Sequence, residues 1–178
     1  MRILAISGSL RDSSSNTILL NAMIRLAPED VEIILYQELN ELPHFNPDFD
    51  GENVARSVSS LRRRIKSADG VLISSPEYAH GVPGVLKNAL DWLVSSGETV
   101  EKPFALINAN PRAHHAQEQL VEILGTMAAK VYTKAAIAVP IAGKNLDENE
   151  IIADATLTTL LRSIILDFAG SIANLDKS

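Results

Sequence analysis

The sequence contains no cysteine among its 178 residues. This absence excludes disulfide bonds, catalysis by a thiolate and iron–sulfur clusters held by cysteine, and it suits a reducing compartment. The glycine patterns of two large nucleotide-binding classes are also missing. No G-x-G-x-x-G follows the first apolar run, which argues against a Rossmann dinucleotide fold. No G-x-x-x-x-G-K-[ST] is present, which argues against a P-loop triphosphatase.

Basic residues and long apolar runs are scarce as well. The formal net charge is −6, which argues against a dedicated surface for nucleic acid or anionic membrane. The apolar run near Met1 is too short for a signal peptide, and no segment approaches the length of a membrane span. We therefore expect a soluble cytoplasmic protein. Hydrophobic residues make up 46% of the chain, which is enough for the core of one ordinary domain.

Strand-like and helix-like segments alternate along the whole chain. Short apolar or β-branched runs predict five strands, at Arg2–Ser7, Val31–Tyr36, Gly70–Ser74, Pro103–Asn108 and Val131–Val139. The spacing of apolar residues predicts five helices, at Asn16–Ala27, Val54–Ala68, Val82–Ser95, His114–Ala129 and Glu150–Ala169. This alternation predicts a single α/β domain over residues 1–178, with a doubly wound parallel sheet and helices on both faces.

A polar loop, Gly8–Asn16, joins the first predicted strand to the first helix. Backbone N–H groups at the start of a helix bind anions, helped by the positive end of the helix dipole. The loop holds four serines, and Arg11 offers a charged fork to a phosphate oxygen, although Asp12 adds opposing charge. Two interpretations stay open: the loop binds a phosphate group, or its serines and Asn16 only cap the helix.

A second loop, Pro76–Gly84, follows the third predicted strand. In a sheet of order 2-1-3-4-5 the first and third strands flank the topological switch point, so this loop would face Gly8–Asn16 across one crevice. Tyr78, His80 and the backbone amides of the loop suit a flat, partly polar ring. A phosphate group on one side and a planar ring on the other suggest FMN.

Both loops carry recognisable motifs. The pattern G-S-x-R-x-x-S-x-N corresponds to Gly8, Ser9, Arg11, Ser14 and Asn16. The pattern S-P-E-Y, followed by G-x-P-G-x-L-K-N-A-L-D-W, corresponds to Ser75–Tyr78 and Gly81–Trp92. In these motifs the sequence resembles the NAD(P)H-dependent FMN reductases, a family that includes quinone, azo-dye and chromate reductases. The matches span most of residues 1–100.

The resemblance implies a flavodoxin-like fold and an oxidoreductase that uses FMN and NAD(P)H. The pyridine nucleotide would deliver hydride to the flavin, and the flavin would pass electrons to a quinone or similar small-molecule acceptor. Because the cofactor carries this chemistry, no catalytic side chain is expected. The resemblance also implies a homodimer or homotetramer with flavin sites near the subunit interface.

The family pattern places the FMN contacts on three loops. The phosphate contacts fall on Ser9, Arg11, Ser14, Ser15 and Asn16. The contacts with the ring fall on Pro76, Glu77, Tyr78, Ala79, His80 and Gly81. Asn108 is the candidate from the third loop, which lacks the glycines that the family often has there. Many members carry Asn at the position of Ala79, so one side-chain hydrogen bond is missing here.

Two other functions stay open from the sequence: a flavodoxin-like electron carrier without pyridine nucleotide activity, and a non-catalytic binding protein of the same fold. Glu77 is interpreted as a structural side chain whose backbone faces the flavin. The arginines at positions 62–64 form a solvated helix face or attract a nucleotide phosphate. No metal site is expected, because the adjacent His114 and His115 would point apart on a helix and no third ligand is evident.

Overall fold

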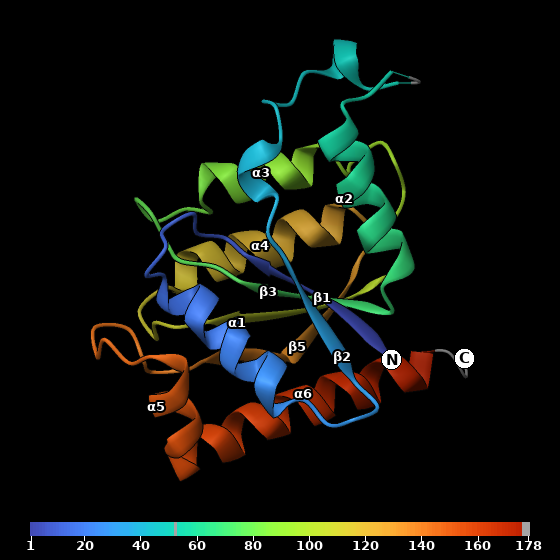
Figure 1. Ribbon diagram of the computed structural model, residues 1–178. Helices are drawn as coiled ribbons and strands as arrows, with labels where there is room; N and C mark the ends of the chain where they lie inside the picture. Colours follow the sequence, from blue (N-terminus) through green and yellow to red (C-terminus); the bar gives the residue numbers. More distant parts are fainter. Residues whose placement is uncertain (52, 176–178) are drawn as a thin grey trace.

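Five parallel strands form the centre of the computed structural model, which describes residues 1–51 and 53–175 (Figure 1). The strands are β1 (Arg2–Ser7), β2 (Glu32–Tyr36), β3 (Gly70–Ser74), β4 (Pro103–Asn108) and β5 (Lys130–Ala138). Their order in the sheet is β2-β1-β3-β4-β5, and each neighbouring pair is parallel. The flavodoxin-like order that the sequence predicts is therefore confirmed.

Helices cover both faces of the sheet, as the crossover connections of a parallel sheet require. One face carries α1 (Ser15–Leu26), α5 (Glu148–Ala153) and α6 (Ala155–Leu175), and the other carries α2 (Arg56–Ser67), α3 (Gly84–Asp91) and α4 (His114–Thr126) (Figure 1). Successive side chains along each strand point to opposite faces of the sheet. Ile3 and Ala5 of β1 belong to the core beneath α1, whereas Leu4 and Ile6 belong to the core beneath α2. Because β1, β3 and β4 are buried on both faces, they read as continuous apolar runs.

The C-terminal region differs from the single helix Glu150–Ala169 that the sequence predicts. It forms two helices, α5 and α6, separated at Asp154. The Asp154 carboxylate accepts hydrogen bonds from the backbone N–H groups of Thr156 (2.9 Å) and Leu157 (3.0 Å). These bonds cap α6 as a new helix. A capping aspartate does not interrupt the helical spacing of the apolar residues on either side of it. The spacing alone therefore predicts one continuous helix where the structure has two.

Among the described helices, α6 is long and apolar enough to cross a membrane by length and composition. The expectation that no segment approaches this length is therefore wrong for α6. Its apolar composition has a cause within the fold, because one face of the helix packs on the sheet and on α1. The buried residues of that face are Leu157, Leu161, Ile164, Ile165, Phe168 and Ile172.

Candidate functional site

The loops after β1 and β3 meet at the carboxyl ends of these strands. The backbone N–H of Gly8 donates to the carbonyl oxygen of Ser74 at 2.8 Å. A Cβ atom on Gly8 would lie 2.6 Å from the Oγ of Ser75, so a larger residue would push the two loops apart. The loops Gly8–Asn16 and Pro76–Gly84 are thus adjacent walls at the edge of the sheet where open α/β folds bind their ligands.

Asn16 connects three parts of this edge. It lies in the first turn of α1 and is buried. Its Oδ1 accepts hydrogen bonds from Ser74 Oγ (2.9 Å) and from the backbone N–H of Ala109 (3.3 Å). The side chain therefore holds the ends of β3 and β4 against the start of α1. A phosphate contact from Asn16 would use its backbone N–H, which a first helical turn leaves outside the helix ladder.

The start of α1 presents hydrogen-bond donors to an anion. Ser14 is the N-cap residue, and its Oγ accepts from the N–H of Thr17 at 3.5 Å. The first bond of the helix runs from Ile18 N–H to Ser14 O, so the N–H groups of Ser15 and Asn16 point out of the helix end. The predicted capping by a serine is confirmed, and it leaves these N–H groups available.

Arg11 extends from the same loop into solvent. Within the described residues its guanidinium donates only to Ser13 Oγ, at 3.5 Å, so it can take a phosphate oxygen without breaking an ion pair. Ser9 is buried, and its Oγ accepts from the Arg11 backbone N–H at 3.3 Å. Ser9 therefore shapes the loop that carries Arg11.

The second loop contains a tight turn between Tyr78 and Gly81. Each of these residues donates its backbone N–H to the carbonyl of the other, at 3.1 and 3.0 Å. The two central residues, Ala79 and His80, have φ values of 50° and 57°, as in a type I′ turn. Asn and Gly adopt such values readily, but Ala and His do so at a cost. The turn is therefore strained, and it holds the Tyr78 side chain 51% exposed.

Two side chains fix this turn against α4. Glu77 Oε2 accepts from the backbone N–H of Ala116 at 3.0 Å and so caps α4, which has no side-chain cap of its own. Gln119 donates to the carbonyl of His80 (3.0 Å) and accepts from the N–H of Val82 (3.2 Å). The Ala116 N–H holds the pKa of Glu77 below its ordinary value, against the opposing effect of burial. This role agrees with the structural side chain that the sequence suggested.

Asn108 is used within the third loop. It is buried at the end of β4, where its Nδ2 donates to Gln117 Oε1 at 2.5 Å and its Oδ1 accepts from the N–H of Asn110 at 3.0 Å. Both polar atoms of the side chain therefore have partners. The Asn108 side chain shapes the loop, and it has less to offer a ligand than the residues of the first two loops.

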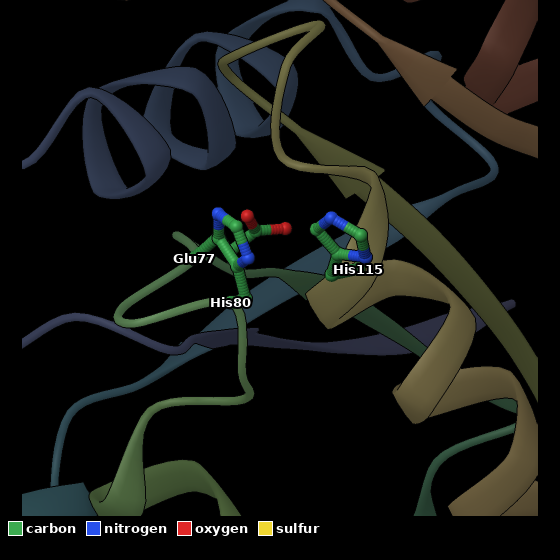
Figure 2. A group of neighbouring side chains, drawn as sticks. All are labelled: Glu77, His80 and His115. Carbon is green, nitrogen blue, oxygen red and sulfur yellow. The ribbon is translucent and has the colours of Figure 1, made fainter.

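The structure also brings together three side chains that the sequence did not connect: Glu77, His80 and His115 (Figure 2). One oxygen or nitrogen atom of each lies within 4.8 Å of those of the others. The rings of His114 and His115 have centroids only 4.0 Å apart, so the expectation that they point apart is wrong. No local pattern signals this cluster, because it depends on how the Tyr78–Gly81 turn is placed against α4.

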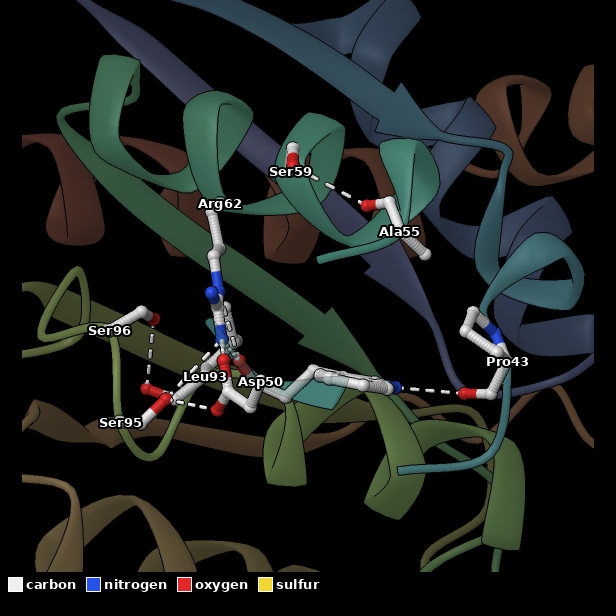
Figure 3. Close-up of polar contacts among 9 residues, drawn as sticks. Pro43, Asp50, Ala55, Ser59, Arg62, Leu93, Ser95 and Ser96 are labelled. Atoms are coloured by element: carbon white, nitrogen blue, oxygen red, sulfur yellow. Dashed lines mark hydrogen bonds and ion pairs between the residues drawn. The ribbon is translucent and has the colours of Figure 1, made fainter. Parts of the chain in front are cut away.

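Arg62, at the centre of α2, anchors the loop before its own helix and does not point to a free anion site. It forms an ion pair with Asp50 at 2.8 Å, and these two side chains are only 14% and 10% exposed. It also donates to the carbonyl of Trp92 (Figure 3). Hydrogen bonds from Ser95 and then Arg62 hold the pKa of Asp50 below its ordinary value. Arg62 therefore neither lies on a solvated helix face nor is free to attract a nucleotide phosphate.

The second half of α3 and the residue that follows the helix hold the same loop from another side. Trp92 Nε1 donates to the carbonyl of Pro43 at 2.8 Å (Figure 3), and Asn88 Oδ1 accepts from the N–H of Phe45 at 2.7 Å. Trp92 is buried in the core. The loop includes two short 3₁₀ helices, η1 (Leu39–Glu41) and η2 (Pro47–Phe49). It therefore bridges α2 and α3.

The donors at this edge fit FMN. The free N–H groups of α1 and the uncommitted Arg11 suit a phosphate dianion. In the described part of the chain, the backbone N–H groups of Glu77, Ala79 and His80 also carry no hydrogen bond, so they can bind the polar edge of a ring. A sheet of order 2-1-3-4-5 with these two walls defines a flavodoxin-like flavoprotein.

Comparison with known proteins identifies the family. The family model described as NADPH-dependent FMN reductase matches residues 1–144. The chain belongs to this family, and it is an oxidoreductase that uses FMN and NAD(P)H.

Individual relatives agree with this membership. The chain is 33% identical to the NADH:(hydroxy)cinnamate reductase subunit CrdA of Vibrio ruber, over 93% of this chain and 86% of the relative. It is 39% identical to a 2-hydroxy-1,4-benzoquinone reductase of Burkholderia sp, over 62% of this chain and 61% of the relative. The solved structure of FerB, an NAD(P)H:(acceptor) oxidoreductase from Paracoccus denitrificans, superposes with a TM-score of 0.82 at 27% identity, covering 97% of both chains. The alignment with the quinone reductase of Escherichia coli spans only 50% of that relative.

The strain in the Tyr78–Gly81 turn is testable by replacing Ala79 with glycine. Relief of the left-handed conformation is worth about 1–2 kcal/mol, less about 0.4–1 kcal/mol for the more flexible unfolded chain. Ala79→Gly should therefore raise the free energy of unfolding by about 0.5–1 kcal/mol, measured by urea denaturation. Ala173→Gly in α6 is the control and should lower it. A loss of stability in Ala79→Gly would contradict a strained turn.

The anchor made by Arg62 is testable by denaturation as well. Arg62→Ala leaves a partly buried carboxylate without its charged donor, so the free energy of unfolding should fall by about 2 kcal/mol at pH 7. Because the pKa of Asp50 is lowered in the fold, this stabilisation is present above the ordinary aspartate pKa and is lost as the pH falls through the folded-state value. The difference from wild type should therefore shrink as the pH falls below the ordinary aspartate pKa of about 3.9. Arg63→Ala, an exposed neighbour, should change stability little at either pH.

Proposed function

We propose that this chain is an NAD(P)H-dependent, FMN-containing oxidoreductase that passes hydride through the flavin to a quinone or similar acceptor. One observation carries the proposal: the donor-rich start of α1 and the exposed turn after β3 are joined at the carboxyl ends of β1 and β3 by the contact of Gly8 with Ser74. Two separate binding elements of one crevice suit a ligand with a phosphate at one end and a ring at the other.

We assign the phosphate of FMN to the first loop. The donors would be the guanidinium of Arg11 and the N–H groups at the start of α1, with Ser9 and Ser14 shaping the loop. The residues of this assignment are Ser9, Arg11, Ser14, Ser15 and Asn16. The structural evidence differs among them, since Asn16 already uses its side-chain oxygen to hold Ser74 and Ala109.

We assign the ring of FMN to the second loop, at Pro76, Glu77, Tyr78, Ala79, His80 and Gly81. The exposed Tyr78 side chain offers an aromatic face, and the three uncommitted N–H groups offer donors. Hydrogen-bond donors near the ring would stabilise negative charge on the reduced flavin, and through this they would set how readily the flavin accepts hydride. Bound FMN would supply the hydride chemistry, and the residues of this chain would orient it and leave one face open.

The acceptor class is supported by the names of relatives. Two of them are called 2-hydroxy-1,4-benzoquinone reductase and quinone reductase. A second candidate function is an electron-transferring subunit without quinone turnover of its own. One observation favours it: the relative that matches 93% of this chain is named as a subunit of a reductase.

We also propose that residues 1–178 form one FMN-binding domain and that the protein is cytoplasmic and assembles as a homodimer or homotetramer. The support for the assembly is the placement of exposed apolar side chains near the crevice, among them Leu10 (55% exposed) and Tyr78 (51% exposed). The support for the location is the absence of cysteine. Light scattering of the purified protein tests the assembly.

The proposed activity is tested by reconstituting the purified chain with FMN and measuring NADH and NADPH oxidation with and without 1,4-benzoquinone. We expect a yellow protein whose nicotinamide oxidation depends on both flavin and quinone. A protein that binds FMN but oxidises neither nicotinamide would favour the electron-transferring alternative. A colourless protein that FMN cannot reconstitute would refute both.

The phosphate assignment is tested by Arg11→Ala. Loss of a charge-assisted hydrogen bond worth about 1.5–3 kcal/mol predicts a Kd for FMN that is about 10- to 100-fold higher, measured by quenching of flavin fluorescence. Riboflavin lacks the phosphate, so its affinity should be the same for both proteins. Arg63→Ala serves as the charge-matched control. An Arg11→Ala protein that binds FMN as wild type does would remove Arg11 from the site.

A further inference from the structure

Glu77, His80 and His115 form a compact group beside the crevice, on the side that faces α4 (Figure 2). Glu77 and His80 come from the loop after β3, and His115 comes from the first turn of α4. Their ligand-type atoms lie within 4.8 Å of one another. Two segments that are distant in the sequence thus contribute to one cluster.

The backbone around this cluster is fixed by contacts that do not use its ring nitrogens. Gln119 holds the His80 carbonyl and the Val82 N–H to α4. The strained φ of His80, 57°, directs its side chain toward α4, where its ring stacks on that of His115 at 4.5 Å between centroids. Such strain is found at ligand clamps, where the surrounding structure holds it in place.

The ring nitrogens themselves are uncommitted. Within residues 1–51 and 53–175, no hydrogen bond or ion pair is made by the imidazole of His80 or of His115. The neighbouring His114 differs, because its Nδ1 lies 3.1 Å from the carbonyl of Arg112. Glu77 caps α4 by accepting from the backbone N–H of Ala116 and also from that of His115, and a carboxylate with about four lone-pair sites keeps capacity for a further partner. The cluster therefore offers two imidazoles and one carboxylate oxygen.

This donor set has a definite chemical preference. Imidazole binds zinc, copper, iron and nickel, and two imidazoles with a carboxylate occur at metal sites that keep open coordination positions. Bond lengths of about 2.0–2.1 Å to zinc place tetrahedral ligand atoms about 3.4 Å apart. Rotation of the exposed His80 side chain can close the difference from the observed spacing.

The charges at the cluster are compatible with a cation. The positive end of α4 opposes a nearby cation, but the Glu77 carboxylate lies directly at this helix end. The Glu77 carboxylate accepts from the Ala116 N–H and brings negative charge to the cluster. Imidazole binds a metal ion in its neutral form, so the two histidine ligands would add no positive charge to the bound ion.

We propose that Glu77, His80 and His115 form a binding site for one divalent transition-metal ion of the zinc type, with its remaining coordination positions open to solvent or a small ligand. The ion connects the Tyr78–Gly81 turn directly to α4. The site is formed by the protein alone, so it does not depend on the proposed flavin function.

The proposal is tested on the full chain, freed of flavin and treated with chelator, by titration with Co²⁺ and with Zn²⁺. We expect one ion per chain with a Kd in the micromolar range, a visible Co²⁺ absorption band, and a rise in Tm on adding Zn²⁺. His80→Ala, His115→Ala and Glu77→Gln should each weaken binding at least tenfold and abolish the rise in Tm. Glu77→Gln keeps an oxygen that can cap α4, so this loss is separable from a folding defect.

His114→Ala is the matched control, since it removes the adjacent imidazole, which lies outside the cluster. It should bind as wild type does. The proposal is overturned if wild type binds no Co²⁺ or Zn²⁺ below millimolar concentration, or if the three variants bind as well as wild type. It is also overturned if His114→Ala loses binding while His80→Ala keeps it. Metal binding by a chain that FMN cannot reconstitute would refute the proposed function and leave this site standing.

Discussion

The site depends on one buried side chain, that of Asn16. Its Oδ1 accepts from Ser74 at the end of β3 and from Ala109 just beyond β4, while its backbone belongs to the first turn of α1. A buried amide oxygen is costly without partners, so these two bonds specify one arrangement of three loops. The close approach of Gly8 to Ser75 also fixes the spacing of the two loops, because a side chain at position 8 would collide with Ser75. The relative placement of the loops after β1 and β3 is therefore set by the packing of the strand ends.

Beyond that junction, the second wall is positioned by α4. The Tyr78–Gly81 turn has an unfavourable backbone at Ala79 and His80, and isolated turns of this kind are weakly specified. The local sequence alone does not stabilise this turn. Hydrogen bonds of Glu77 and Gln119 hold it against α4. The Glu77 carboxylate caps α4, while its own backbone N–H makes no hydrogen bond within the part of the chain that the structure describes. The motif Ser75–Tyr78, which resembles a cofactor-binding motif, thus also supplies the side chain that caps α4.

Most of the fold could be predicted from the sequence because strands buried on both faces leave continuous apolar runs, as in β1 and β3. The boundary between α5 and α6 could not, since Asp154 caps a helix without changing the apolar spacing. At the site, loop positions and the serine cap follow from local chemistry. The partners of Arg62 and Asn16 do not, because Asp50 and Ala109 reach them only through tertiary packing. The same holds for the pair His80 and His115. His114 is the neighbour of His115 in the sequence, whereas tertiary packing places His80, from another loop, in the cluster with His115.

The crevice and the Glu77–His80–His115 cluster share the second loop but use different parts of it. A flat ligand would take the backbone N–H groups and the Tyr78 face, whereas the cluster uses side chains that point toward α4. The backbone N–H groups of Glu77, Ala79 and His80 make no hydrogen bond in the described part of the chain, whereas the cluster consists of side-chain atoms, so the two proposed ligands would bind different atoms of the same loop.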